Sequence, residues 1–531
     1  MKNKHNNWSK TKKSYFNWLE KNELRSIFSQ KILYENYSLW WSTNLIEKGL
    51  TQDNKWYFNL DCIINKKNIL GKTNKKNLIY LLLRLIFKIF SSIFFNLIIK
   101  IFFRDKKNKE NNNINCFFSA QYNFINHKQK IIDRQYGLTT FKKNKNNKYL
   151  LLLENNFNLI FKMLKIKKQL DKVSLDYFIL NRHISILEIL VVNYKVFIKM
   201  LHLLIILSKK NYFIINNKNC SSVLKPLLLE SFFGQIQNEI INGIALRNFF
   251  LKNRFKNFIS YFGFLPGSRA CYYFLKNKKN SPRVITINHA LFVDNYLNNS
   301  IRKNEFCKDD EDPFFSPKPN IYLTQGNRLR KIIKKKIKNI KTYTIGSLKL
   351  TLSNFKFKKE LFKKRNFYLK GTKKKILLIC TGINDYDPFI KILNNCNLKN
   401  FLCILSCHPM EKKKGLEIFN KNFKHKFVTS KDYSSRELIR ISDFVVVSSS
   451  AMGHEALIAK KNVIRLFDSR YPPLFDFDDG LTTINNYKFL QKKLTKIKFN
   501  KYKFREFIKN FYYKYDNKGH IRLLKFLKKI S

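Results

Sequence analysis

Three short polar stretches, each directly after an apolar run, carry residue types that could bind a phosphorylated or hydroxylated ligand. They are Thr381-Gly382, His408-Pro409 and Ser448–Ser450. Hydroxyls, an imidazole and the backbone amides of a glycine-containing turn can all donate hydrogen bonds to phosphate oxygens. If the preceding runs are neighbouring parallel strands, the three stretches meet at one edge of a sheet. Together they indicate a ligand site more strongly than any one of them alone.

The stretch at Ser448–Ser450 has the clearest local pattern. Bulky β-formers precede it at Phe444–Val447, and helix formers follow at Ala451–Lys460, with Ser450 in the position of an N-cap. Hydroxyls at a helix N-terminus favour anions, and Glu455, about one turn further on, could accept hydrogen bonds from sugar hydroxyls. An ordinary strand–helix–strand unit with a serine cap explains the same residues equally well.

Apolar runs that alternate with helical stretches predict an α/β protein with two Rossmann-like domains, each built on a doubly wound parallel sheet. The strands expected in the second domain are Lys375–Cys380, Phe401–Leu405, Phe444–Val447 and Val463–Phe467. The strands expected in the first domain are Cys116–Ala120, Phe258–Phe264, Arg283–Asn288, Ile321–Thr324 and Thr342–Ile345. His289 directly follows one of them, so its side chain is a further candidate for the ligand-binding edge.

The pattern divides the chain into three parts. Residues 1–105 form an N-terminal region that holds all five tryptophans, and its Ser38–Gly49 piece reads as an aromatic cluster rather than a ligand site. Residues 114–350 form the first Rossmann-like domain, with a helical insertion at 150–210. Residues 370–531 form the second Rossmann-like domain and the C-terminal helices.

The most apolar stretch is 78–103, which is long enough to cross a membrane as a helix. Three readings are open: a spanning or hairpin-like segment, a helix that lies in the membrane interface, and a buried helix of a soluble domain. Polar and charged residues within the stretch argue against a helix that crosses the membrane. They are Arg84, Lys88, Asn96 and Lys100. A second apolar stretch, Leu187–Leu207, is expected to belong to the helical insertion rather than to touch a membrane.

The composition is strongly basic, with 103 Lys+Arg against 36 Asp+Glu and a net charge of +67. Because these residues are dispersed along the chain, they predict weak attraction to anionic membrane surfaces and no specific nucleic-acid site. The nine cysteines include no CxxC pair, so neither a metal site nor a disulfide framework is expected. Met1–Lys13 is polar and lacks the apolar core of a signal peptide, which favours a cytoplasmic location.

Several motifs resemble bacterial surface-carbohydrate proteins, of the kind that build O-antigen and capsule with a GT-B glycosyltransferase fold. The resemblance covers about residues 225–470. It is carried by SRACYYF (Ser268–Phe274), VITINHA (Val284–Ala290), PNIYLTQG (Pro319–Gly326), IGSLKL (Ile345–Leu350), ILSCHPM (Ile404–Met410) and SDFVVVSSSAMGHEALIAKKNVIRL (Ser442–Leu466). DRQYG (Asp133–Gly137) fits the same family.

The resemblance implies a nucleotide-sugar donor in the second domain and a glycan or lipid-linked acceptor in the first, at the inner face of the cytoplasmic membrane. No further cofactor and no metal are implied. By this analogy the donor site comprises Gly382, His408, Pro409, Ser448, Ser449, Ser450 and Glu455. His289, at the cleft between the domains, would be the general base that takes a proton from the acceptor hydroxyl.

Two other functions fit the same sequence. One is a nucleotide-sugar 2-epimerase of the same fold, which would need several acid/base groups in the cleft. The other is a non-catalytic, membrane-associated paralogue that binds polyanions through its net charge. The sequence also departs from the family at Pro266-Gly267 and Asn288, where similar proteins carry Glu and Gln. His454, beside Glu455, is expected to face solvent.

Overall fold

The structure is a computed structural model of the whole chain, and it divides into two compact units. The first unit comprises residues 1–290, 297–352 and 516–531, and the second comprises 291–296 and 353–515. The residues described are 2–47, 55–65, 78–106, 114–120, 124–127, 130–133, 135–136, 147–153, 168, 176–261, 263–276, 281–288, 301–306, 312–337, 339–348, 365–369, 374–382, 386–408, 412–429, 435–448, 450, 452–466, 481–496, 501–514, 516 and 518–530.

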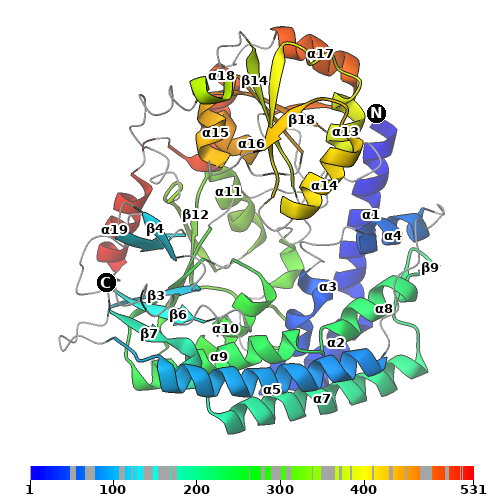
Figure 1. Cartoon of the computed structure of the whole chain (residues 1–531). Coiled ribbons are helices and arrows are strands. Elements are labelled where there is room, and N and C mark those ends of the chain that lie inside the picture. The colour runs from blue at the N-terminus through cyan, green and yellow to red at the C-terminus, as the bar shows by residue number, and fades with distance from the viewer. Residues whose placement is uncertain are drawn as a thin grey trace. The chain divides into compact units, whose positions relative to one another are not determined.

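The first unit is built on a parallel sheet that has seven strands within the described residues (Figure 1). In spatial order they are β13 (Lys341–Thr344), β12 (Ile321–Thr324), β11 (Arg283–Ile287), β10 (Asn257–Ser260), β3 (Asn115–Ala120), β6 (Asn147–Leu152) and β7 (Tyr177–Ile179). The chain starts at β3, winds outward to β7, returns to β10 and winds outward again. The strand order therefore reverses between β3 and β10, as in a doubly wound Rossmann sheet.

The second unit repeats this pattern with six parallel strands among its described residues. In spatial order they are β16 (Phe427–Thr429), β15 (Phe401–Ser406), β14 (Lys375–Cys380), β17 (Phe444–Val447), β18 (Asn462–Leu466) and β19 (Thr482–Ile484). The order reverses between β14 and β17. Two parallel sheets with helical connections confirm the predicted α/β fold with two Rossmann-like domains.

Helices cover both sheets because the strands are buried on both faces, which leaves apolar side chains to be packed on each side. The helices of the first unit are α1 (Lys2–Lys21), α2 (Glu23–Gln30), α3 (Asn44–Glu47), α4 (Lys55–Ile64), α5 (Leu78–Phe102), α7 (Ile186–Lys209), α8 (Ser221–Glu230), α9 (Gln235–Lys252), α10 (Pro266–Lys276), α11 (Asn327–Lys336) and α19 (Gly519–Ile530). Those of the second unit are α13 (Asp387–Leu393), α14 (Lys412–Asn422), α15 (Ser435–Ile441), α16 (Met452–Ile458), α17 (Tyr487–Lys496) and α18 (Lys501–Phe507).

Short elements complete the units. The described residues of the first unit include three two-stranded antiparallel hairpins: β1–β2 (Leu33–Tyr34, Tyr37–Ser38), β4–β5 (Phe124–His127, Lys130–Asp133) and β8–β9 (Ile214–Ile215, Lys218–Asn219). Single turns of 3-10 helix occur at Leu39–Ser42, Leu180–His183 and Lys303–Glu305, and a π-helical turn occurs at Ile508–Tyr512.

The tryptophan-rich N-terminal region packs into the first unit. Trp40 and Trp41 are completely buried, and the Trp40 ring contacts Phe28 edge-on at 5.5 Å between centroids. The Trp41 indole donates a hydrogen bond to the Pro313 carbonyl across 3.2 Å. Trp40 and Trp41 are therefore core residues, as an aromatic cluster requires.

The structure places two segments in other parts of the fold than the predicted domain ranges do. Helix α19 packs in the first unit, where Arg522 donates a hydrogen bond to the Ile345 carbonyl across 2.7 Å. Gly519 lies so close to Ser347 that a Cβ there would come within 2.5 Å of the Ser347 carbonyl oxygen. Strand β7 lies inside the range expected to be a helical insertion, beside β6 in the sheet.

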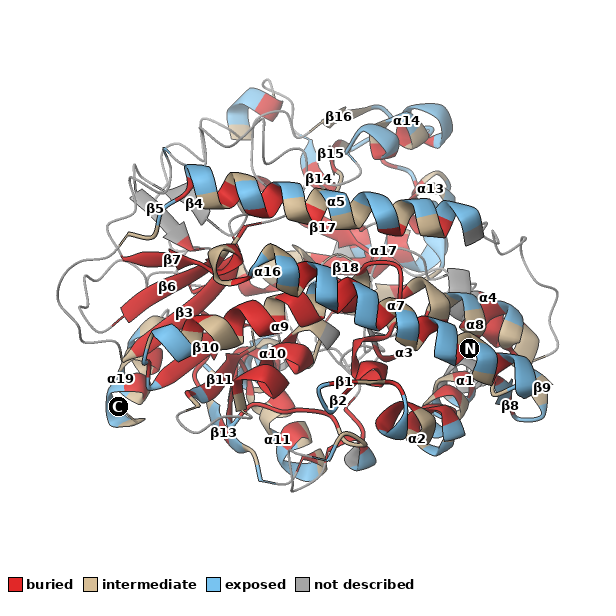
Figure 2. Cartoon of the chain, turned by 90° about the horizontal axis from the view of Figure 1, so that it is seen from below, coloured by how far each residue is buried: buried red, intermediate tan, exposed pale blue. Residues whose placement is uncertain are grey.

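Helices α5 and α7 are both long and apolar enough to cross a membrane by length and composition. They pack against each other at the surface of the first unit (Figures 1 and 2). One face of α5 contributes Leu81, Leu85, Phe95 and Ile99 to the core of that unit.

Candidate functional site

The three polar stretches that the sequence singled out follow adjacent strands of the second sheet. β14 lies between β15 and β17, and Cys380 is opposite both Ser406 and Val447. Thr381, Cys407 and Ser448 are the next residues, so they lie side by side at the carboxyl edge. This edge includes the point between β14 and β17 where the strand order reverses, and open α/β sheets bind their ligands there.

Hydrogen bonds join the loops after β14 and β15. The backbone amide of Thr381 donates to the Ser406 carbonyl across 3.2 Å. The Thr381 hydroxyl oxygen accepts a hydrogen bond from the backbone amide of His408 across 3.3 Å. Thr381 and Gly382 are buried, and His408 is partly exposed. The backbone at His408 is therefore fixed against the end of the central strand, which the sequence did not predict for Thr381.

Ser448 and Ser450 differ in what their hydroxyls do. Ser450 Oγ accepts a hydrogen bond from the Met452 amide across 3.3 Å, so it caps α16 as predicted. Ser448 is 5% exposed, and within the described part of the chain its Oγ has no hydrogen-bond partner. A buried hydroxyl without a partner costs free energy, and a ligand oxygen at this edge would remove that cost.

Helix α16 approaches the sheet closely at Gly453. A Cβ at this position would come within 2.8 Å of Val447 Cγ2 and 3.1 Å of Leu481 Cδ1. His454 is buried, with its ring stacked 5.6 Å from Phe507 and 6.5 Å from Phe511. The expectation that His454 faces solvent is wrong, because the C-terminal aromatic residues cover this side of α16.

Glu455 lies near the end of β14. Burial is the largest cause of a rise in the pKa of the Cys380 thiol to about 12, and the nearby Glu455 and Cys407 contribute to the same rise. Both groups are therefore within electrostatic range of Cys380. The partly exposed Glu455 carboxylate lies in the first turn of α16, the helix that follows β17 and Ser448.

Three predicted site residues, His289, Pro409 and Ser449, lie outside the described residues. The residue before His289, Asn288, lies at the end of β11, and its amide donates to the Leu323 carbonyl across 2.8 Å. The general-base role of His289 and its position between the domains remain predictions.

The carboxyl edge of the first sheet carries polar groups that the sequence singled out only in part. Tyr136, from the DRQYG motif, donates its hydroxyl to the Phe118 carbonyl at 2.7 Å and lies 3.1 Å from the Ile259 carbonyl. It thus bridges β3 and β10, where the strand order reverses. Nearby, Tyr272 and Thr286 share a hydrogen bond of 2.5 Å between their hydroxyls, which the sequence did not predict.

A buried cluster of charges lies where the segment after β11 meets α10. Arg269 and Glu305 form an ion pair of 2.5 Å, and Arg302 Nε lies 3.3 Å from the same carboxylate. Arg25 donates hydrogen bonds to the Asn304 and Phe314 carbonyls. Burial lowers the pKa of Arg25 to about 10, and repulsion by Arg302 and Arg269 contributes. Sequence spacing could not find this cluster, because its members come from distant segments.

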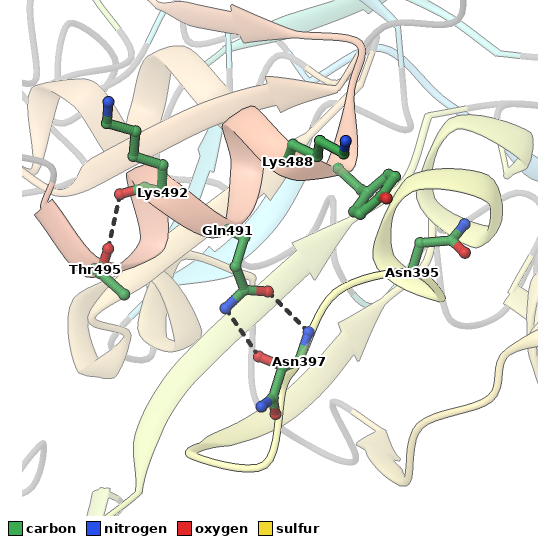
Figure 3. A pocket seen from close by; sticks show the side chains of 7 residues that line it. Asn395, Asn397, Lys488, Gln491, Lys492 and Thr495 are labelled. Atoms are coloured by element: carbon green, nitrogen blue, oxygen red, sulfur yellow. Dashed lines mark hydrogen bonds between the residues drawn. The ribbon is translucent and has the colours of Figure 1, made fainter.

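A surface pocket of about 540 Å³ in the second unit lies away from the predicted site (Figure 3). Its lining residues are Asn395, Asn397, Tyr487, Lys488, Gln491, Lys492 and Thr495. Gln491 and Asn397 join its two walls by hydrogen bonds of 2.8 and 3.3 Å. Asn397 precedes β15, at the amino edge of the sheet, and none of the predicted donor-site residues lines the pocket.

Comparisons with known proteins find similarity among solved structures. No protein-family model matches the chain, and no curated protein matches it. A structure of the wall teichoic acid polymerase TagF soaked with CDPG is 11% identical, with 86% of this chain and 98% of that chain covered and a TM-score of 0.40. The UDP-GlcNAc 2-epimerase from Neisseria meningitidis bound to UDP-GlcNAc is 13% identical, with 78% and 99% covered and a TM-score of 0.46.

A third similar structure is a putative UDP-N-acetylglucosamine 2-epimerase from Listeria monocytogenes, 9% identical, with 79% and 96% covered and a TM-score of 0.43. At these scores the similarities add nothing to the fold assignment, which the two parallel sheets establish themselves. They do not distinguish a transferase from an epimerase.

Among the described residues, no group of three His, Cys, Asp or Glu side chains is placed to hold a metal ion. The described polar groups at the carboxyl edge of the second sheet include the hydroxyls of Thr381 and Ser448, backbone amides, the Cys407 thiol and the His408 imidazole, and Glu455 adds a carboxylate in the first turn of α16. This set suits hydrogen bonding to a phosphorylated sugar.

Proposed function

We propose that this protein is a glycosyltransferase that moves a sugar from a nucleotide-sugar to a surface polysaccharide or lipid-linked glycan, as in O-antigen or capsule synthesis. The observation that supports it best is the edge at which Thr381, His408 and Ser448 come together, with the Ser448 hydroxyl buried and without a partner among the described residues. The strand order reverses there, which is the usual ligand position in such sheets.

In this proposal the donor lies across the ends of β14, β15 and β17. Gly382, the segment His408-Pro409 and the serines Ser448–Ser450 would bind the nucleotide and its phosphates, and Glu455 would accept hydrogen bonds from the donor sugar. Hydroxyl and amide donors would stabilise the charge that develops on the leaving phosphate. His289 would act as the general base toward the acceptor hydroxyl. The reaction would take place at the cytoplasmic face of the membrane.

The Ser448→Ala variant tests the donor site. We expect it to weaken binding of the cognate nucleoside diphosphate about 10- to 100-fold, as loss of a hydrogen bond to a charged group would. The free energy of unfolding should stay the same or rise, since the hydroxyl has no hydrogen-bond partner among the described residues. The measurement is isothermal titration of the full chain with UDP, CDP, GDP and TDP, alongside thermal unfolding.

Ser442→Ala is the matched control. Ser442 is also buried, at the other end of the same strand, and its hydroxyl donates to the Leu438 carbonyl across 2.5 Å. Its removal should lower stability by about 1 kcal/mol and leave nucleotide affinity unchanged. Equal affinities for wild type and Ser448→Ala, or no binding of any nucleotide by the folded protein, would count against the proposal.

The two alternative functions predict different products. A 2-epimerase would convert a nucleotide-sugar without an acceptor, and Glu455 is the one described carboxylate that we assign to this edge. A non-catalytic paralogue would bind polyanions in a salt-dependent way and turn over no nucleotide-sugar. Acceptor-dependent release of the nucleoside diphosphate would exclude both.

A further inference from the structure

Helix α5 presents a continuous apolar stripe to solvent. Ten large side chains on it are each between 42% and 68% exposed: Ile79, Tyr80, Leu83, Ile86, Phe87, Phe90, Phe94, Leu97, Ile101 and Phe102. Most are three or four residues apart, so they share one face of the helix. From Ile79 to Ile101 the stripe is about 33 Å long at 1.5 Å per residue.

Three of the four polar residues that argued against a membrane-crossing helix lie on the opposite side of α5. Arg84 pairs with Glu230 of α8 at 3.3 Å. Lys88 lies against Gly234, where a Cβ would come within 2.5 Å of its Nζ. Asn96 is buried and donates to the Asn181 carbonyl across 2.8 Å. These contacts attach α5 lengthwise to the first unit, so the helix is amphipathic and the charges do not interrupt its exposed stripe.

Helix α7 repeats this arrangement beside α5. Seven of its large apolar side chains are exposed: Leu187, Leu190, Val191, Tyr194, Ile198, Leu201 and Ile205. Its other face is buried in the core through Ile189, Val192, Val196, Met200, Leu203 and Leu207. Figure 2 shows α5 and α7 next to each other, both with exposed faces turned toward the viewer. The sequence had assigned this stretch to an insertion without membrane contact.

The rim of this two-helix face is basic. Lys195 and Lys209 of α7 are exposed, as is the adjoining Lys210, which pairs with Glu23 at 2.8 Å. α5 has no acidic residue, and the one acidic residue of α7, Glu188, accepts hydrogen bonds from Ser185 and Asn248. Seventeen exposed apolar side chains within a basic rim form a far larger patch than isolated surface residues make.

We propose that α5 and α7 form an in-plane docking face for an anionic lipid bilayer, and that neither helix crosses it. The apolar stripes would lie in the boundary between headgroups and acyl chains, with the lysines at the anionic headgroups. A lipid surface fits better than a protein partner because the stripes offer hardly any hydrogen-bonding groups, whereas protein interfaces combine apolar centres with directional polar contacts. This inference does not depend on the proposed reaction.

Vesicle flotation of the full-length protein tests this face. We expect binding to vesicles of phosphatidylcholine mixed with phosphatidylglycerol, and severalfold weaker binding to phosphatidylcholine alone. The double variant Phe90→Asn/Leu201→Asn should lower the partition coefficient at least about tenfold, because two exposed apolar anchors are lost. Phe489→Asn is the control, since Phe489 is 61% exposed on α17 of the second unit, and it should bind as wild type does.

Topology is tested with single cysteines on the sealed vesicles, in a background in which Cys307 and Cys407 are serine. An in-plane helix predicts that Arg84→Cys and Arg104→Cys, which lie near the two ends of α5 and outside its apolar stripe, both react with a membrane-impermeant thiol reagent added outside. Reaction at only one end would mean that α5 crosses the bilayer and would overturn the proposal. Absence of vesicle binding would also overturn the proposal. A dimer of the wild-type protein in light scattering, absent in Phe90→Asn/Leu201→Asn, would do the same, because the face would then bind a second copy of the chain. Nucleotide affinity of Phe90→Asn/Leu201→Asn and of Phe489→Asn serves as a separate readout, since neither of these two variants changes a residue of the donor site.

Discussion

The backbone amide of His408 donates a hydrogen bond to Oγ1 of Thr381 across 3.3 Å, which joins the loops that leave β14 and β15. The two residues follow neighbouring strands that are in register as far as Cys380 and Ser406. The position of His408 at the carboxyl edge therefore depends on a threonine side chain as well as on the sheet. This relationship makes Thr381 a positioning residue for the proposed donor site.

Replacing this threonine should affect binding more than folding. Thr381→Val keeps the size of the side chain but removes the acceptor, so the His408 loop loses one hydrogen bond, worth about 0.5–1.5 kcal/mol. We expect nucleotide affinity to fall about 2- to 10-fold. Thr381→Ser keeps the hydroxyl and should restore it. If titration finds the valine variant as tight as the serine variant, the hydrogen bond does not position the loop.

Gly453 should be intolerant of any side chain. An alanine Cβ would come within 2.8 Å of Val447, a branched side chain of the central sheet that cannot move aside easily. Gly453→Ala should lower the free energy of unfolding by about 1–3 kcal/mol, measured by urea denaturation. Gly267→Ala is the matched helical control, because the nearest atom to its Cβ is Glu239 Cγ at 3.7 Å. A control variant that is equally destabilised would show that the close approach to β17 is not the cause.

In the buried charge cluster, loss of the carboxylate should lower the free energy of unfolding more than loss of one arginine. Glu305→Gln would leave Arg269 and Arg302 buried without the carboxylate that they share, and should cost about 3–5 kcal/mol of stability. Arg302→Met should cost clearly less, since among the described residues Nη1 and Nη2 of Arg302 have no hydrogen-bond partner and its charge repels Arg25. Chemical denaturation gives the free energy of unfolding of both variants. A larger loss of stability for Arg302→Met than for Glu305→Gln would contradict these assigned roles.

Glu188 should make stability depend on pH near the start of α7. Burial alone would raise its pKa, but hydrogen bonds from Ser185 and Asn248 and the charge of Arg247 outweigh burial and hold it below the ordinary 4.5. Because the folded pKa is the lower one, its stabilisation is complete above pH 4.5 and disappears as the pH falls through the folded value. Glu188→Gln should therefore cost about 0.5–2 kcal/mol at pH 7 and progressively less in acid.

The control for this titration is Glu23→Gln. Glu23 pairs with Lys210 at 2.8 Å, but both side chains are exposed, so the pair should contribute at most about 1 kcal/mol. Thermal unfolding of the three proteins between pH 3 and pH 7 is the measurement. A difference between wild type and Glu188→Gln that stays constant over this range would contradict the assigned pKa.

Much of the sheet structure could be predicted, because apolar runs bounded by turn residues carry strong local information. β14 and β17 begin and end where Lys375–Cys380 and Phe444–Val447 predicted, and Ser450 caps α16 as expected. The adjacency of the loops after β14, β15 and β17 also followed from the strand–helix alternation.

Features that depend on distant contacts could not be predicted. His454 is buried because Phe507 and Phe511, from the far end of the second unit, stack on it. In the sequence, the charge of Arg84 argues against a membrane-crossing helix; only the fold shows that it pairs with Glu230 of α8, away from the exposed stripe. Arg25 and Phe314 are far apart in the sequence, and no local pattern indicates their contact.

The proposed function requires above all that the second unit binds a nucleotide-sugar at the ends of β14, β15 and β17. Hydrogen–deuterium exchange of the full chain, with and without a saturating nucleoside diphosphate chosen by titration, tests it most directly. We predict slower exchange at 381–382, 407–408 and 448–455, and no change at 395–397 and 488–495 around the pocket at the amino edge. Protection confined to that pocket, or no protection anywhere in the second unit, would contradict the claim.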